Sequence, residues 1–93
     1  MMNLNYEIKC VAREVMLAMF TNEVYLKTAD VTDEKVIKTM NERMLLLTKL
    51  DTKVADIEME AFKVNDKEAV NKCERIRYKI AGELRAIRVK YNL

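Results

Sequence analysis

Residues 40–64 read MNERMLLLTKLDTKVADIEMEAFKV and contain the cleanest heptad repeat of the chain. Apolar residues alternate there at steps of three and four, which is the spacing of a helix that packs along one side against another helix. The repeat interleaves two sets of apolar residues: Met40, Leu47, Val54 and Ala61 with Leu50, Ile57 and Val64. These spacings predict a long helix over 33–64. We expect it to continue through Asp51 and Thr52, because neither is glycine or proline.

A second apolar stripe follows a break at Asn65 and Asp66 and predicts a helix over 66–91, with Asn65 as its N-cap. The stripe consists of Ala69, Cys73, Ile76, Ile80, Leu84, Ile87 and Tyr91. Residues that face each other in an antiparallel hairpin have numbers with a nearly constant sum. Seven apolar pairs fit a sum of 130 or 131, from Ala61 with Ala69 at the turn to Met40 with Tyr91 at the far end. The sequence therefore predicts a long antiparallel helical hairpin.

A first helix is predicted over 5–27, ahead of a break at 28–32 in which Thr32 is the expected N-cap of the next helix. Its apolar stripe consists of Leu4, Ile8, Val11, Val15 and Met19. Folded back over the break, this helix sets Val15–Phe20 beside Asn41–Leu46. We thus expect an all-α fold: one domain spanning 1–93, built as a three-helix antiparallel bundle on the hairpin.

Two apolar runs, VMLAMF at 15–20 and MLLL at 44–47, are more continuous than an amphipathic helix requires. Four consecutive residues sweep about 300° around a helix, so such runs call for burial on every side. Three helices provide too little cover, and we expect a homo-oligomer or a protein partner. The residues expected to be left over for this interface are Phe20, Leu26, Leu45 and Leu46. The methionines nearby fit either a gap-filling core or an adaptable recognition surface.

Catalysis and metal binding lack their usual residues. The 93 residues include no histidine, serine, proline, glutamine or tryptophan and one glycine, and 51% of them are hydrophobic. A serine or cysteine nucleophile beside a base, a zinc site and a phosphate loop are all disfavoured. The alternating acids Asp56, Glu58 and Glu60 point about 200° apart and are expected on a solvated face. Cys10 and Cys73 are expected as separate, reduced apolar groups. We expect no enzyme activity, no metal and no cofactor.

The chain shows no signal-peptide pattern and no run of the roughly 20 apolar residues that span a membrane. We therefore expect a cytoplasmic protein without membrane contact. The net charge is +2, but residues 69–93 carry two acids and seven bases. The last helix is thus strongly basic.

One constellation in this basic helix could hold a phosphate ligand. Gly82 lies between Tyr78 and Arg85, with Arg75 and Arg88 at either side, and a missing side chain beside an aromatic ring and guanidinium groups could form a notch. Two other interpretations remain open: Gly82 permits the close approach of another helix, or the arginines belong to a solvated face.

The sequence favours a small non-enzymatic helical binding protein that associates with itself or another macromolecule as an adaptor, inhibitor or assembly factor. The alternative is a binder of nucleotide or nucleic-acid phosphate through the last helix.

Overall fold

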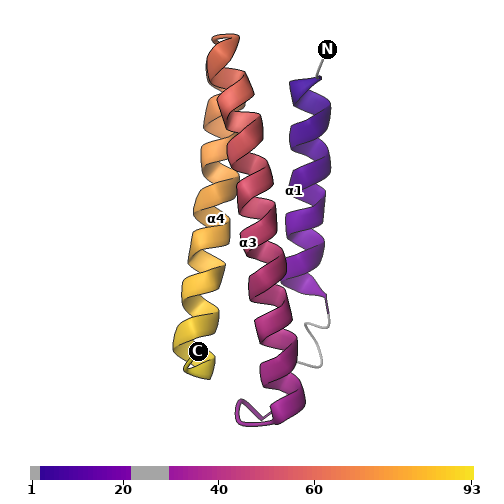
Figure 1. Ribbon diagram of the computed structural model, residues 1–93, viewed down its shortest axis with the longest axis vertical. Coiled ribbons are helices and arrows are strands. Elements are labelled where there is room, and N and C mark those ends of the chain that lie inside the picture. The colour runs from indigo at the N-terminus through magenta and orange to yellow at the C-terminus, as the bar shows by residue number, and fades with distance from the viewer. Residues whose placement is uncertain (1–2, 22–29) are drawn as a thin grey trace.

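The computed structural model describes residues 3–21 and 30–93, and all regular secondary structure within them is helical. The helices are α1 (Leu4–Phe20), α3 (Glu34–Lys63) and α4 (Lys67–Tyr91). They lie side by side in an elongated bundle of 47 × 19 × 16 Å, in which α3 runs opposite to both α1 and α4 (Figure 1). The most extensive packing joins α3 to α4. The predicted all-α fold of three packed helices is confirmed.

The predicted pairs of the hairpin all contribute to one core. Of the fourteen residues in the seven pairs, eleven are buried, and Met44, Ile76 and Leu84 are partly buried and pack against them. α3 is one helix of 30 residues that continues through Asp51 and Thr52. The heptad repeat of α3 up to Ala61 and the stripe of α4 therefore face the same interior. Val64, predicted as part of the repeat, is instead 64% exposed, because α3 ends at Lys63 and the chain turns there.

The N-caps differ from those predicted by one residue. Asp33 rather than Thr32 caps α3, and its carboxylate accepts a hydrogen bond of 2.8 Å from the backbone N–H of Lys35. Thr32 donates both its backbone N–H and its hydroxyl to Asp30, which lowers the pKa of the Asp30 carboxyl. A carboxylate is the better cap because it also interacts with the positive end of the helix dipole.

The α3–α4 turn is likewise capped by an aspartate. Asp66, not Asn65, accepts the capping hydrogen bond of 3.0 Å, from the backbone N–H of Ala69. Asn65 takes the left-handed conformation, with φ 58°, and asparagine tolerates it better than most residues. The backbone N–H of Asp66 then closes the turn onto the carbonyl of Ala61 at 2.9 Å.

α1 is shorter than the predicted helix over 5–27. It begins after the N-cap Asn3 and ends at Phe20, because Thr21 has an extended backbone. Residues 22–29, which include Leu26, lie outside the described residues. The C-terminal carbonyls of a helix lack intrahelical hydrogen-bond donors. At the end of α1, a side chain from α3 supplies these donors.

That side chain is Arg43, which is 8% exposed. Its guanidinium donates to the carbonyl of Met19 at 2.8 Å and to the carbonyl of Thr21, and it lies 4.0 Å from the carboxylate of Glu83 on α4. A cation at this end of α1 also complements the helix dipole. One residue thus links all three helices, at the level where the sequence places Val15–Phe20 beside Asn41–Leu46.

Candidate functional site

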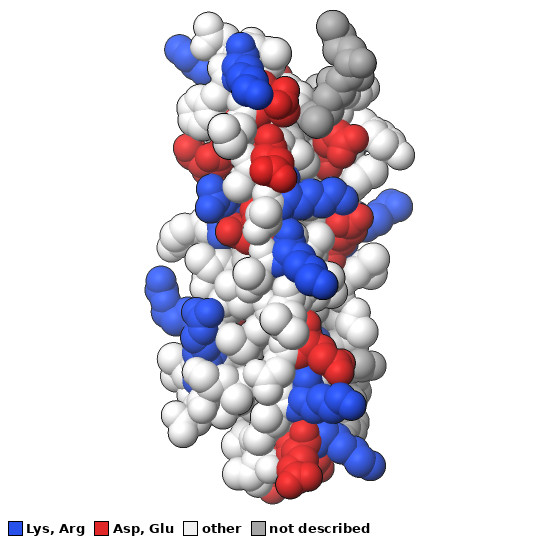
Figure 2. All heavy atoms as spheres, in the orientation of Figure 1, with Lys and Arg blue, Asp and Glu red and all other residues white. Residues whose placement is uncertain are grey.

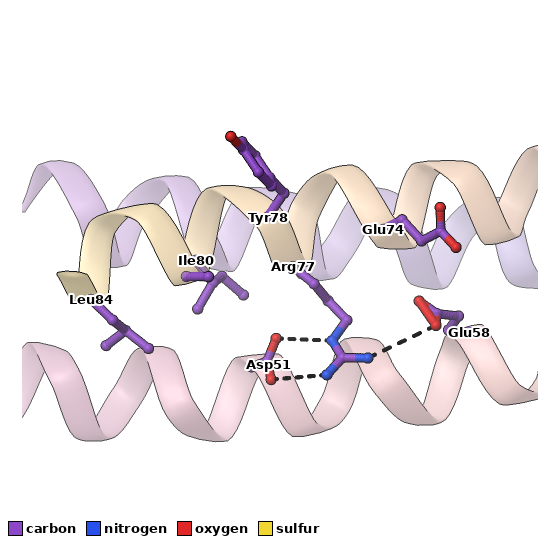
Figure 3. Close-up of a pocket in the computed structure, with 8 residues that line it drawn as sticks. Asp51, Glu58, Glu74, Arg77, Tyr78, Ile80 and Leu84 are labelled. Carbon is purple, nitrogen blue, oxygen red and sulfur yellow. Dashed lines mark hydrogen bonds and ion pairs between the residues drawn. The ribbon is translucent and has the colours of Figure 1, made fainter. Parts of the chain in front are cut away.

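A hollow of about 390 Å³ lies between α3 and α4 and is centred on Arg77 (Figure 3). The guanidinium reaches from α4 to α3, where its Nε donates to Asp51 Oδ1 at 3.1 Å and a terminal nitrogen lies 3.8 Å from Glu58 Oε1. The hydrogen bond with Asp51 raises the pKa of Arg77. Arg77 therefore remains charged and joins the two helices of the hairpin.

The alternation of Asp56, Glu58 and Glu60 led us to expect all three on a solvated face. Glu58 does not lie there. Its side chain is 15% exposed, and its Oε2 is buried without a hydrogen-bond partner among the described residues. Burial and the nearby Glu58 carboxylate raise the pKa of the Cys73 thiol, which favours the unreactive protonated form. Neither cysteine forms a disulfide.

The charged side chains of this hollow pair mainly with one another. Arg77 already engages Asp51 and Glu58, and the carboxylate of Glu74 lies at one edge of the same hollow (Figure 3). No group of three or more acidic or cysteine side chains within residues 3–21 and 30–93 could hold a metal ion. The arrangement joins α3 to α4.

The five residues of the candidate phosphate site, Arg75, Tyr78, Gly82, Arg85 and Arg88, are all exposed on α4. Tyr78 is 82% exposed and points away from α3 (Figure 3). Arg75 and Tyr78 border a hollow of about 460 Å³ that is lined by α4 alone. No carboxylate in the described residues forms an ion pair with Arg75, Arg85 or Arg88. On the face shown in Figure 2, the charged side chains along the lower part of α4 are basic.

Gly82 faces open space. A Cβ atom placed on it would meet no heavy atom of the described residues within 4 Å. Close approach of α1 or α3 therefore does not explain the glycine, and a basic face with an open position remains.

Of the residues predicted as a protein interface, Leu26 lies outside the described residues, and Phe20, Leu45 and Leu46 are exposed but lie on different sides of the bundle. Phe20 is 60% exposed and borders α4, whereas Leu45 lies two residues, or about 200°, from the fully buried Leu47 and points away from the core. Leu46 lies one heptad before Lys53, whose ammonium contacts Glu14 of α1 at 3.3 Å, and so lies at the α1–α3 seam. Phe20, Leu45 and Leu46 therefore do not form one continuous surface.

The largely apolar groove of the structure runs between α1 and α4. It has a volume of about 400 Å³ and is lined by Ala12, Val15, Met16, Met19, Phe20, Ile76 and Lys79. The two helices run parallel here, and their packing is the least extensive of the three helix pairs (Figure 1). Met16 is 60% exposed within it, although methionine is more often buried. The groove is open along one side.

Sequence patterns indicated some residues of this groove and missed others. Met16, Met19 and Phe20 belong to the predicted apolar run, and Ile76 to the stripe of α4. No sequence pattern predicted that Lys79 lines a groove. The role of Arg43 was not predicted either, although this residue lies on the core stripe between Met40 and Leu47 at steps of three and four.

None of the described helices is long and apolar enough to cross a membrane. No family model, no curated protein and no solved structure matches the chain. The site must therefore be interpreted from its own residues.

Proposed function

We propose that this protein acts by binding, and that the groove between α1 and α4 receives an amphipathic helix of another protein. The observation that carries the proposal is the exposure of Met16 and Phe20 in a groove whose other walls, apart from Lys79, are apolar. An added helix would complete a fourth position of the bundle and cover these side chains, as in helix-in-groove recognition. Such a role suits an adaptor, inhibitor or assembly factor.

The methionines favour this role over a purely structural one. Met16 and Met19 are unbranched and can adapt to different apolar side chains, which suits a surface that accepts a partner helix. The groove lacks the residues of a catalytic site, since it contains no carboxylate, cysteine or hydroxyl side chain in its lining.

The test compares two adjacent side chains of α1 with nearly equal exposure. Met16 is 60% exposed inside the groove, and Leu17 is 61% exposed on the α3 side, one turn after Glu14. The probe is a fluorescent helical peptide with a leucine stripe and glutamine at all other positions. We expect Met16→Asp to weaken binding by about tenfold or more, because the aspartate would be buried unpaired. We expect Leu17→Asp to bind like wild type.

Circular dichroism of both variants checks that they remain folded. Equal affinity of wild type, Met16→Asp and Leu17→Asp for the peptide would contradict the proposed groove.

A homo-oligomer built through Phe20, Leu45 and Leu46 remains a separate proposal. These three side chains lie on different sides of the bundle, so one two-fold interface does not cover all of them. A symmetric dimer could use one of them, and light scattering of Leu46→Glu tests a dimer built through Leu46.

The second candidate function is phosphate binding by the outward face of α4. It is favoured by the exposed Arg75, Arg85 and Arg88, which have no ion-pair partner in the described part of the chain. Inorganic triphosphate should then raise the melting temperature of wild type and not of Arg85→Ala. An equal response of both proteins would argue against this function.

A further inference from the structure

We infer that the helix received by the α1–α4 groove is acidic, with carboxylates on both flanks of its apolar face. The inference rests on the proposed function and adds the charge of the partner. It comes from the basic side chains that border the two walls of the groove.

The α4 wall carries two bases that form no ion pair with the described residues. Lys79 lines the groove itself, and Arg75 lies one helical turn before it. Both side chains are exposed, and neither forms an ion pair with a described residue. Two carboxylates near this wall are already engaged: Glu68 pairs with Lys72 at 3.3 Å, and Glu83 faces Arg43.

The α1 wall of the groove also carries two exposed bases. Lys9 and Arg13 precede Met16 and Phe20 by seven residues each, so each base lies on the same stripe of the helix as the apolar residue that follows it. Both bases are exposed and form no ion pair within residues 3–21 and 30–93. Four bases therefore flank an apolar floor.

This combination favours an acidic helix over a basic one or a nucleic acid. Opposite charges at the rim of an interface speed association and reject partners of the wrong charge. A nucleic acid would instead need aromatic platforms for its bases, and Phe20 is the one aromatic residue in the lining of this groove. The apolar floor formed by Met16, Met19 and Ile76 fits aliphatic side chains.

The experiment uses three fluorescent helical peptides with the same leucine stripe and with glutamate, glutamine or lysine on its flanks. Fluorescence anisotropy gives the dissociation constants at 50 and 300 mM NaCl. We expect the glutamate peptide to bind about tenfold more tightly than the glutamine peptide at 50 mM salt, and the lysine peptide to bind most weakly. The difference should shrink at 300 mM salt, because the rim charges are screened.

Charge reversal assigns the effect to the groove. Arg13→Glu combined with Lys79→Glu sets two new carboxylates against the remaining Lys9 and Arg75, so it should abolish the preference for the glutamate peptide. The matched control, Arg85→Glu combined with Arg88→Glu, changes charge equally on α4 outside the groove and should leave the order unchanged. The inference is overturned if the glutamate and glutamine peptides bind wild type equally, or if the control variant loses the preference as well.

Two further outcomes separate this inference from the proposed function. If all three peptides bind equally and Met16→Asp abolishes binding, the acidic partner is wrong and the groove function stands. If no peptide binds, both are wrong. Tighter binding of a 20-nucleotide single-stranded RNA than of the glutamate peptide, lost in the Arg13→Glu and Lys79→Glu variant, would replace the acidic helix with a nucleic acid.

Discussion

Replacing Arg43 with methionine should destabilise the bundle far more than replacing an exposed arginine. Methionine keeps most of the aliphatic packing, so the change removes chiefly the polar contacts. It deletes the hydrogen bonds to the carbonyls of Met19 and Thr21 and the interaction with Glu83 at 4.0 Å. Each hydrogen bond from a charged donor contributes roughly 1.5–3 kcal/mol.

The expected loss for Arg43→Met is about 2–4 kcal/mol, because methionine recovers part of the energy through apolar contact and water can reach the end of α1. A chain of this size has a total stability of roughly 5–14 kcal/mol. Such a loss would lower the melting temperature by roughly 10–25 °C. Urea unfolding followed by circular dichroism should show a lower midpoint with an unchanged slope.

Two matched variants make this prediction specific. Arg75→Met removes an exposed arginine without a described ion-pair partner and should change stability by no more than about 0.5 kcal/mol. Arg43→Lys keeps the charge but lacks the forked donors, so its loss should lie between the other two. If Arg43→Met changed stability as little as Arg75→Met, the guanidinium would not hold the end of α1.

Three other expected outcomes test the core, the basic face and self-association. Ile80→Ala should lower the free energy of unfolding in urea by about 2–5 kcal/mol, because Ile80 is 1% exposed and the change leaves a cavity. A loss below about 1 kcal/mol would contradict the hairpin core. Gly82→Leu should raise stability by roughly 1 kcal/mol, since nothing lies within 4 Å of the added Cβ, and lower stability would reveal a close contact with a second copy. If the chain self-associates through Leu46, light scattering should show a dimer at micromolar concentration that Leu46→Glu dissociates; a wild-type monomer across a hundredfold dilution would end this hypothesis.

The hairpin could be predicted because both helices carry apolar stripes at steps of three and four residues. A stripe fixes both the rotation of a helix and its register. Between Ala61 and Met40 the buried residues follow it except at Met44, which is partly buried beside the buried Arg43. The continuity of α3 through Asp51 also followed from composition alone. Local signals were less decisive at the helix ends, where Asp33 and Asp66 compete with Thr32 and Asn65 as caps.

The apolar runs were less informative about function, because a run around the whole helix does not say which side is covered. Val15 and Leu47 take the inward positions of the two runs and are buried. The other side chains of these runs point in different directions. Met16 lines a groove because α1 and α4 are not closely packed at its level. The distance between these two helices cannot be predicted from the sequence of either one alone. The cap provided by Arg43 depends in the same way on where α1 ends.

The most direct test of the α1–α4 groove is the mapping of amide chemical shifts when the glutamate-flanked peptide is added to the labelled wild-type protein. We predict that the largest shifts fall at residues 12–20 and 76–79, which line the two walls. The outward residues Arg85, Arg88 and Leu45 should remain unchanged. Shifts concentrated at 85–88 or 45–46, with residues 12–20 unaffected, would place the binding surface elsewhere and contradict the account.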